Sequence, residues 1–243
     1  MAEQDAQILG FVSLLTRDAV CYIAEFFVRQ DCQSAKIGGA LLHKVLPQEG
    51  QTICTFSSRD FRALSLYVRA GLHPLWPNFQ LRVRSTDLGI LPEYDIEATQ
   101  ANPDDPDLVA HDRQISGRRR PQDLGYLTRE LGATPLLFRR SGRVVGYGYA
   151  QMRSPGSLWY PEAITLGPIG ASSADDALAC VCSAVDWARS RATMLRISVP
   201  GPHLSLQPLL KAGFRITYLE TFLATSNDKL PDPSCYLPTI TFF

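Results

Sequence analysis

The sequence predicts an α/β protein whose two halves repeat one order of elements. Residues 8–83 give two strands, a helix, a strand, a helix and a strand, and residues 107–224 give a longer version of that order. Between the halves lies Asn102–Pro106, a polar connector broken by proline. A shared order over this length indicates the duplication of a domain rather than a short-period repeat.

The first half opens with a hairpin. The apolar runs Ile8–Leu15 and Ala19–Val28 flank three polar residues, which is a hairpin pattern. Apolar residues then recur at helical spacing from Ile37 until Pro47–Gly50 ends the helix. The remaining elements are a strand over Gln51–Phe56, a helix over Arg62–Ala70 that Gly71 stops, and strands within Leu72–Val83 that Pro74 and Pro77 interrupt.

The second half starts with two helices. Its elements are helices over 107–116 and 122–131, strands over Pro135–Arg140, Val144–Met152 and Trp159–Leu166, a helix over Ala174–Arg191, a strand over Leu195–Val199, a helix over Leu204–Ala212 and a strand over Phe214–Ala224. The basic cluster Arg118–Arg120 falls between the first two helices, and we expect it in a solvated loop.

These patterns define the expected domains. They are a first domain over residues 1–85, a linker over 86–106, a second domain over 107–226 and a proline-rich tail over 227–243. The last residues of the tail could add a strand to the second domain.

The composition excludes several classes of protein. Hydrophobic residues make up 45% of the 243 residues and charged residues 20%, so wholesale disorder is excluded. Lys plus Arg and Asp plus Glu number 24 each. Because the chain therefore has no net charge to attract nucleic acid or an anionic membrane, we expect neither as a partner.

The chain carries no targeting or metal-binding pattern. Met1–Gln7 is acidic and does not resemble a secretory signal, and no run approaches the roughly 18 to 20 apolar residues that span a bilayer. The six cysteines include no Cys-x-x-Cys pair, so neither a structural zinc nor a disulfide framework is expected. We expect a cytoplasmic protein without a metal.

The segment from Val28 to Leu42 carries the chemistry of the first half. A strand leads through a polar turn into a helix that opens with Gly38 and Gly39. The first N–H groups of a helix have no partner within it, the helix dipole attracts anions, and glycines leave space for one. The segment is therefore a candidate pyrophosphate cradle. In the alternative interpretation, the two glycines only allow close packing of the helix.

Together with the helix about 20 residues further on, this segment resembles the GNAT superfamily of acetyl-CoA-dependent N-acetyltransferases. That family has Val-x-x-x-x-(Gln/Arg)-x-x-Gly-x-(Gly/Ala) at the strand-to-helix turn and Asn-x-x-Ala-x-x-x-Tyr-x-x-x-Gly-Phe on the next helix. The residues that match in order and spacing are Val28, Gln33, Gly38, Ala63, Tyr67 and Gly71. The resemblance implies two tandem domains, each a mixed, mostly antiparallel sheet flanked by helices.

The resemblance also implies acetyl-CoA as the co-substrate of the first domain. Val28 would lie on a splayed strand that pairs with the pantetheine arm, and backbone amides from Gln33 to Gly38 would hold the pyrophosphate. The implied cofactor-binding residues are Phe27, Val28, Gln33, Ser34, Ala35, Lys36, Ile37, Gly38, Gly39, Asp60 and Ala63.

Two residues are candidates for acid–base chemistry. By resemblance, Tyr67 would protonate the departing thiolate. The alternative is a core aromatic on an amphipathic helix. Glu25, three residues before Val28, is the best-placed carboxylate for a general base, and its alternative is a solvent-side strand residue. Water can also accept the proton of an amine, so no base is required.

Three features depart from the family pattern. Lys36 stands where the family has glycine, and a positive φ there would cost about 1 kcal/mol. Asp60 stands where the family has asparagine, and its charge would repel phosphates mildly. Only seven residues precede Ile8, where the family has a strand, two helices and another strand. We expect either an N-terminal truncation or a second domain that supplies this wall of the acceptor site.

The second half resembles the same superfamily more faintly, over about residues 95–226. Arg143–Gly148 matches the common strand entry, and Lys211–Phe214 matches the closing Gly-Phe. At the cradle position, Gly167–Asp176 contains a proline that removes a donor and two aspartates that would oppose a pyrophosphate. Leu209 takes the place of Tyr67. We expect this half to have lost cofactor binding and to serve as scaffold or acceptor-site wall.

The sequence thus predicts an N-acetyltransferase that moves acetyl from acetyl-CoA to a primary amine of a small molecule or peptide by direct attack. It would act as a monomer or homodimer. Two alternatives stay open: a non-catalytic acyl-CoA-binding protein, and a structural protein derived from a decayed or truncated GNAT domain. The sequence does not name the acceptor.

Overall fold

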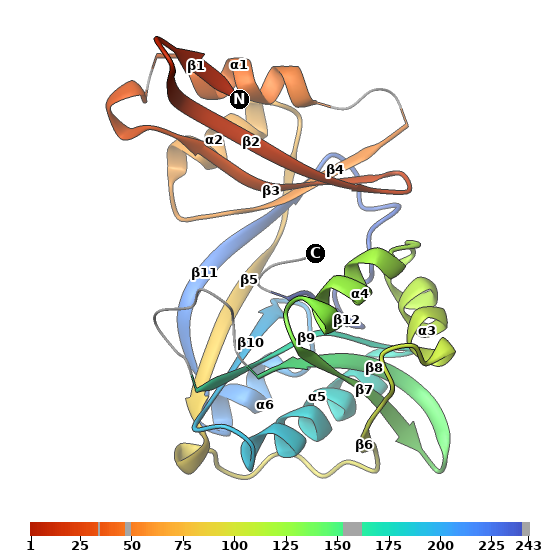
Figure 1. Ribbon diagram of the computed structural model, residues 1–243. Helices are drawn as coiled ribbons and strands as arrows, with labels where there is room; N and C mark the ends of the chain where they lie inside the picture. Colours follow the sequence, from red (N-terminus) through yellow and green to blue (C-terminus); the bar gives the residue numbers. More distant parts are fainter. Residues whose placement is uncertain (34, 47–49, 153–161, 240–243) are drawn as a thin grey trace. The chain divides into compact units, whose positions relative to one another are not determined.

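The computed structural model describes residues 1–33, 35–46, 50–152 and 162–239. The chain packs into two compact units, unit 1 (Met1–Pro77 and Glu220–Leu230) and unit 2 (Asn78–Leu219 and Pro231–Phe243). Strands β5 (His73–Arg84) and β11 (Arg215–Ala224) each run from one unit into the other (Figure 1). These units are defined by packing, and the domain limits expected from the sequence stay a prediction.

Unit 1 is a sheet with two α-helices. Its complete elements are β1 (Ala2–Gln4), β2 (Gln7–Arg17), β3 (Val20–Val28), a 3-10 turn (Gln30–Cys32), α1 (Ile37–Val45), β4 (Thr52–Ser57) and α2 (Phe61–Arg69). The strand order is β1-β2-β3-β4-β11. β3 pairs antiparallel with β2 and parallel with β4, and β4 pairs antiparallel with β11. The expected hairpin and the expected strand–helix alternation are confirmed, whereas β1 was not expected.

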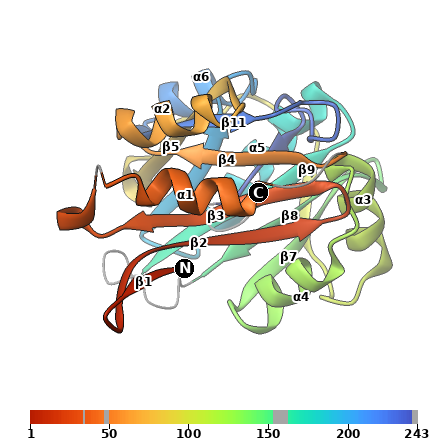
Figure 2. The same ribbon diagram turned by 90° about the horizontal axis from the view of Figure 1, so that it is seen from above.

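The two helices of unit 1 cover one face of its sheet. α1 lies over β2 and β3 (Figure 2). The buried cluster beneath the helices contains Ile23, Leu42, Ile53, Tyr67, Leu72 and Leu223. Since strand side chains alternate between faces, the residues between these core positions point to the other face of the sheet.

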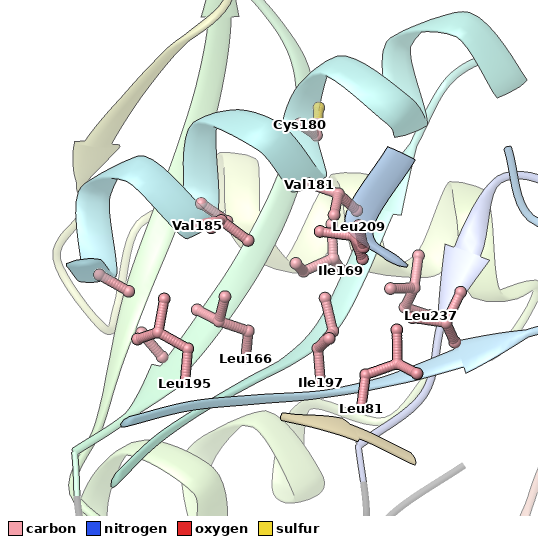
Figure 3. Packing of buried hydrophobic residues seen from close by; sticks show 14 of the residues in the cluster. Leu81, Leu166, Ile169, Cys180, Val181, Val185, Leu195, Ile197, Leu209 and Leu237 are labelled. Atoms are coloured by element: carbon pink, nitrogen blue, oxygen red, sulfur yellow. The ribbon is translucent and has the colours of Figure 1, made fainter. Parts of the chain in front are cut away.

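Unit 2 is a larger sheet with four α-helices among the described residues. Its complete elements are a 3-10 turn (Ser85–Asp87), β6 (Glu97–Gln100), α3 (Pro106–Ser116), α4 (Pro121–Arg129), β7 (Ala133–Arg140), β8 (Arg143–Gln151), β9 (Ala163–Ala171), α5 (Ala174–Arg189), β10 (Met194–Pro200), α6 (Leu206–Lys211) and β12 (Tyr236–Leu237). The strand order is β11-β5-β10-β9-β8-β7-β6, and β12 pairs with β9. Helix α5 packs on the sheet through the core that Figure 3 shows, with Val181 and Val185 above Leu166, Leu195 and Ile197.

Three expectations about strands need correction. β5 is one continuous strand, because the residues that pair with β10 are Asn78–Arg84 and so follow Pro74 and Pro77. The expected connector contains β6, which pairs with β7. The expected strand over Trp159–Leu166 lies partly outside the described residues, and its described part, β9, continues to Ala171.

The tail behaves as the sequence suggested. Tyr236 and Leu237 form β12, antiparallel to β9. Leu237 is fully buried in the core of unit 2. The tail therefore adds a strand to the unit 2 sheet.

The cluster Arg118–Arg120 is not the solvated loop that we expected. Arg118 and Arg120 are each only 3% exposed. The Arg120 guanidinium pairs with Asp112, with 2.6 Å between Nη2 and Oδ1, and donates a second hydrogen bond to the Tyr236 hydroxyl. A buried carboxylate and a tyrosine thus compensate a charge that the local sequence alone assigns to solvent.

Candidate active site

A pocket of about 790 Å³ opens in unit 1 beside the start of α1, the end of β3 and the first two turns of α2. Eight of the residues predicted to bind the cofactor line it: Phe27, Val28, Gln33, Lys36, Gly38, Gly39, Asp60 and Ala63. Ala35 and Ile37 belong to the same turn but are not in the lining, and Ser34 lies outside the described residues. The structure therefore brings together two segments that are about 20 residues apart in sequence.

The start of α1 supplies the donors of this pocket. The N–H groups of Ile37, Gly38 and Gly39 occupy the first turn, where a helix offers no internal acceptor and its dipole is positive. The amides of Gln33 and Ala35, by contrast, donate to the carbonyls of Gln30 and Cys32 at 3.4 Å each. The cradle thus depends on the first turn of the helix more than on the preceding loop.

The two glycines serve different purposes. A Cβ on Gly38 would come within 3.3 Å of Leu66 and 3.5 Å of Phe26, so a side chain there would need the Leu66 side chain to shift by a few tenths of an ångström. A Cβ on Gly39 would meet only Leu66, at 3.9 Å. Both interpretations considered from the sequence therefore hold in part: Gly38 permits close packing, and both glycines keep the pocket wall free of side chains.

Lys36 adopts the left-handed conformation, with φ of 63°, immediately before α1. This is the positive φ that the glycine of the family pattern would accept without strain. Lys36 lines the pocket and is exposed, and so are Arg62 and Arg69 on α2. Together they make the pocket basic.

Asp60 is the N-cap of α2. Its carboxylate accepts a hydrogen bond from the backbone N–H of Arg62 at 2.9 Å and pairs with the Arg62 guanidinium at 2.8 Å. These hydrogen bonds lower the pKa of Asp60 to about 2. The Asp60 carboxylate thus caps the helix and forms the ion pair at once.

Arg62 also connects the two halves of the pocket wall. Its Nη1 donates to Oε1 of Gln33 at 2.8 Å, and Nε2 of Gln33 donates to the carbonyl of Val28 at 3.2 Å. The Gln33 side chain therefore bridges the end of β3 and the start of α2. Sequence reasoning missed Arg62, although its position two residues after the helix cap was a usable signal.

Strands β3 and β4 separate next to this pocket. They pair only over Val20–Tyr22 and Thr52–Cys54, and both continue beyond that point. The β2–β3 register also shifts between Ser13 and Leu14, which leaves Ala24 without a partner in β2. The bulge and the gap between β3 and β4 lie at one place, and they expose backbone N–H and C=O groups that a regular sheet would use in hydrogen bonds between strands.

Tyr67 lies behind the pocket wall rather than in it. Its side chain is 5% exposed and belongs to the core cluster, and its ring centroid is 5.9 Å from that of Phe26, which lines the pocket. Its hydroxyl lies near the Thr55 side chain, and the Thr55 hydroxyl donates to the carbonyl of Ile23 at 3.0 Å. The hydroxyl is therefore at the point where β3 and β4 separate, while the ring is a core residue.

Burial raises the pKa of Tyr67 above its ordinary value, so the phenol is protonated at neutral pH. That state suits a proton donor. The Tyr67 ring contacts Phe26, which lines the pocket. The role of Tyr67 as an acid stays a prediction.

Glu25 is exposed on β3 opposite Ser13 and does not line the pocket. Ser13 and Leu14 alternate across β2, and Leu14 packs with the helices, so Glu25 projects from the face of the sheet that the helices leave uncovered. Its role as a base likewise stays a prediction.

The corresponding segment of unit 2 is packed in the interior. Gly167–Ala171 belongs to β9, which is buried throughout, and a Cβ on Gly170 would come within 2.6 Å of the Tyr147 ring. These glycines serve packing. Leu209, at the position that corresponds to Tyr67, is fully buried.

The described residues also lack two features. No helix among the described residues is long and apolar enough to cross a membrane. Within the same residues, no group of three or more His, Cys, Asp or Glu side chains could hold a metal ion. All six cysteines are free thiols.

Comparison with known proteins identifies the class. Residues 1–80 match the acetyltransferase (GNAT) domain family. Among curated proteins, no sequence matches the chain. A protein of Pyrococcus horikoshii assigned to the acetyltransferases superposes with a TM-score of 0.73 at 13% identity, over 98% of this chain and 78% of that one.

Other solved GNAT proteins share the fold. A GCN5-related N-acetyltransferase from Sphaerobacter thermophilus superposes with a TM-score of 0.56 at 14% identity, over 90% of this chain and 77% of that one. A tandem GNAT protein from the clavulanic acid biosynthesis pathway gives 0.57 at 12% identity, over 91% and 80%. Residues 1–80 thus match the GNAT acetyltransferase domain family, and the chain as a whole shares its fold with solved GNAT proteins, a tandem GNAT protein among them.

Proposed function

We propose that the chain is an N-acetyltransferase that binds acetyl-CoA in the pocket of unit 1 and transfers the acetyl group to a primary amine of a small molecule or peptide in the cytoplasm. The observation that carries this proposal is the pocket itself. It combines the first turn of α1, a basic lining and the gap between β3 and β4. These features suit the diphosphate and the extended arm of coenzyme A.

The residues present fit such a cofactor. The N–H groups of Ile37–Gly39 and the ammonium group of Lys36 would hold the pyrophosphate. Asp60 would repel it, but its charge is compensated by Arg62 at 2.8 Å. The unpaired edge of β3 beyond Tyr22 would bind the pantetheine amides as another strand would.

Acetyl-CoA supplies a thioester: the amine nitrogen bonds to its carbonyl carbon, the carbon–sulfur bond breaks, and the sulfur takes a proton. An ammonium substrate must therefore lose one proton before attack and a second afterwards. Glu25 or water would accept these protons. Tyr67, protonated because it is buried, would give one to the sulfur.

The direct test is a calorimetric titration of coenzyme A into the protein and into Gly38→Glu. The glutamate would occupy the pocket beside Leu66 and Phe26 and oppose the phosphates, so we expect binding to be lost. Gln4→Glu adds the same charge on exposed β1 and should bind as the parent does. If coenzyme A bound all three proteins with equal affinity, its site would lie elsewhere. If it bound none of them, the proposed cofactor site would be refuted.

One observation favours a second function, that of a non-catalytic acyl-CoA-binding protein. Tyr67 is 5% exposed and does not line the pocket. Incubation with acetyl-CoA and a broad panel of amines, read by the release of free thiol, separates the two functions. Cofactor binding without thiol release for any amine would establish the second.

A further inference from the structure

Helix α2 carries an apolar stripe on its solvent side. Phe61 and Val68 are seven residues apart, so they lie on the same side of the helix, where they are 79% and 46% exposed. Ser65 lies between them, and its hydroxyl donates to the carbonyl of Phe61 at 2.6 Å, so this hydroxyl is bonded within the helix. We call Phe61, Ser65 and Val68 the α2 stripe. The other side of the helix packs into the core of unit 1 through Leu66 and Tyr67.

The α2 stripe is continuous with the pocket proposed for acetyl-CoA. Phe61 and Ser65 line that pocket, whereas Val68 is not in its lining. Arg62 and Arg69, which are also seven residues apart, border the stripe on the side of the pocket, since both line the pocket as well. A molecule that covers the α2 stripe therefore lies at the opening of the pocket.

The two helices beside the pocket form a basic surface. Residues 35–46 and 58–70 contain five basic side chains and one acidic side chain, although basic and acidic residues number 24 each in the whole chain. The basic ones are all exposed, and the set is Lys36, Lys44, Arg59, Arg62 and Arg69, with Asp60 as the acidic one. Asp60 is paired with Arg62 at 2.8 Å. This excess of positive charge favours an acidic partner.

The composition of this surface is typical of a protein–protein contact. Exposed aromatic rings next to arginines are the side chains that most often dominate the binding energy of interfaces. A partner that covers Phe61 is also beside a pocket that suits a phosphate group and a pantetheine arm. Small acidic carrier proteins hold acyl groups as thioesters on such an arm, which is the same phosphopantetheine that coenzyme A contains. The partner and the pocket thus point to one chemistry.

We propose that the α2 stripe docks an acidic carrier protein that presents an acyl group on a phosphopantetheine arm. This inference rests on the proposed function and extends its donor from acetyl-CoA to a carrier-bound thioester. The phosphate of the arm would lie at the first turn of α1, and its amides would follow β3. In the transfer, the amine nitrogen bonds to the carbonyl carbon and the carbon–sulfur bond breaks. The sulfur of the arm takes a proton that the amine releases.

Two other occupants would use the same charges. The 3′-phosphate of coenzyme A would lie beside the arginines, and an anionic membrane would cover the whole basic surface. Val68 separates the first of these from a carrier protein, because it belongs to the α2 stripe but not to the lining of the pocket. Vesicles that contain phosphatidylserine test the second.

The experiment is a set of calorimetric titrations into the full chain. The probes are a holo acyl carrier protein, its apo form without the arm, and free 4′-phosphopantetheine. We expect the holo form to bind at least about tenfold more tightly than the free arm, because the arm and the docking surface act together. Saturating coenzyme A should lower the affinity of the holo form to that of the apo form, since coenzyme A and the arm compete for one pocket.

Variants of Val68 test the docking surface itself. Val68→Glu places a negative charge within the α2 stripe and should raise the Kd for the apo and holo forms by about tenfold. Its Kd for coenzyme A should equal that of the parent, which also shows that the variant is folded. Val68→Ile keeps the apolar contact and should behave as the parent does. Ile90→Glu, at a position of unit 2 that is 95% exposed, is the control and should change neither affinity.

Three results would overturn the inference. One is a holo form that binds no more tightly than free phosphopantetheine, or that binds Val68→Glu as well as the parent. Another is a Val68→Glu variant that loses affinity for coenzyme A and the carrier alike, which would assign the stripe to the nucleotide. The third is binding to the vesicles without binding to the carrier.

Failure of the proposed function would look different. A parent protein that does not bind coenzyme A would refute the cofactor site. The titration of the apo form measures docking without any arm, so its result does not depend on that site. The two failures are therefore distinguishable.

Discussion

The guanidinium of Arg62 donates a hydrogen bond to the side-chain oxygen of Gln33 at 2.8 Å, and this contact joins the start of α2 to the turn before α1. The same guanidinium neutralises Asp60. Arg62, which is not part of the family pattern, therefore neutralises Asp60, which stands where that pattern has asparagine. The effect of the Asp60 charge on binding at the proposed phosphate site can therefore be tested.

Asp60→Asn should strengthen coenzyme A binding. Asparagine caps a helix as well as aspartate does, so α2 should still begin at the same residue. The change removes a carboxylate whose pKa is about 2 and which is therefore charged at neutral pH. We expect the Kd for coenzyme A to fall by about two- to fivefold, since one repulsive charge at the surface is removed. Calorimetry measures the change, and weaker binding would mean that Asp60 itself contacts the ligand.

Lys36 combines an unfavourable backbone with a favourable charge. Its φ is 63°, so Lys36→Gly should raise the free energy of unfolding by up to about 1 kcal/mol. The same variant should weaken coenzyme A binding, because the ammonium group is lost. Lys36→Asn separates the effects, since asparagine tolerates the left-handed region but carries no charge. Urea denaturation measures the free energy of unfolding, and calorimetry measures the affinity for coenzyme A. A Lys36→Gly variant less stable than the parent would contradict the predicted backbone strain at Lys36.

Tyr67→Phe tests the acid. The change removes the hydroxyl near Thr55 and keeps the ring in the core. We expect turnover to fall at least tenfold with little change in the Kd for coenzyme A. Thr55→Val removes the hydroxyl near the phenol and should reduce turnover less. Equal rates for the parent and Tyr67→Phe would exclude the phenol from the mechanism.

Local patterns predicted most of unit 1. The hairpin, the helix from Ile37 and the cradle residues follow from periodicity and from turn chemistry, because each depends on neighbours in sequence. The basic lining at Arg62 and Arg69 was not predicted, since it arises only when α2 is placed beside α1. The position of Tyr67 behind Phe26 has the same origin in packing.

Long-range contacts explain the errors in unit 2. Arg120 has the sequence neighbours of a solvated loop, yet Asp112 on α3 and Tyr236 on β12 bury it. Tyr236 is 116 residues away, and no local pattern reports such a partner.

The buried pair of Arg120 and Asp112 gives a stability prediction. Both side chains are 2% exposed, and Asp112 also accepts a hydrogen bond from the Tyr147 hydroxyl at 2.5 Å. Arg120→Met leaves the carboxylate buried without its cation, which costs about 3–5 kcal/mol. Adding Asp112→Leu should restore part of the loss. Chemical denaturation of the single and double variants measures this, and additive losses would show that the two charges are not coupled.

His203 predicts how stability depends on pH. The side chain is 2% exposed, and burial lowers its pKa to about 4 from the ordinary 6.5. Its Nδ1 accepts a hydrogen bond from the backbone N–H of Ser205 at 3.2 Å, which requires the neutral ring. Between pH 6.5 and about 4, the unfolded chain therefore binds a proton that the folded chain does not.

The sign follows from this difference. As the pH falls through that window, His203 should lower the free energy of unfolding by about 1.4 kcal/mol for each pH unit. Urea denaturation from pH 7 to pH 4 measures the slope. His203→Gln should flatten it, and His73→Gln, at an exposed position, should leave it unchanged. A His203→Gln profile as steep as that of the parent would assign the acid sensitivity to other groups.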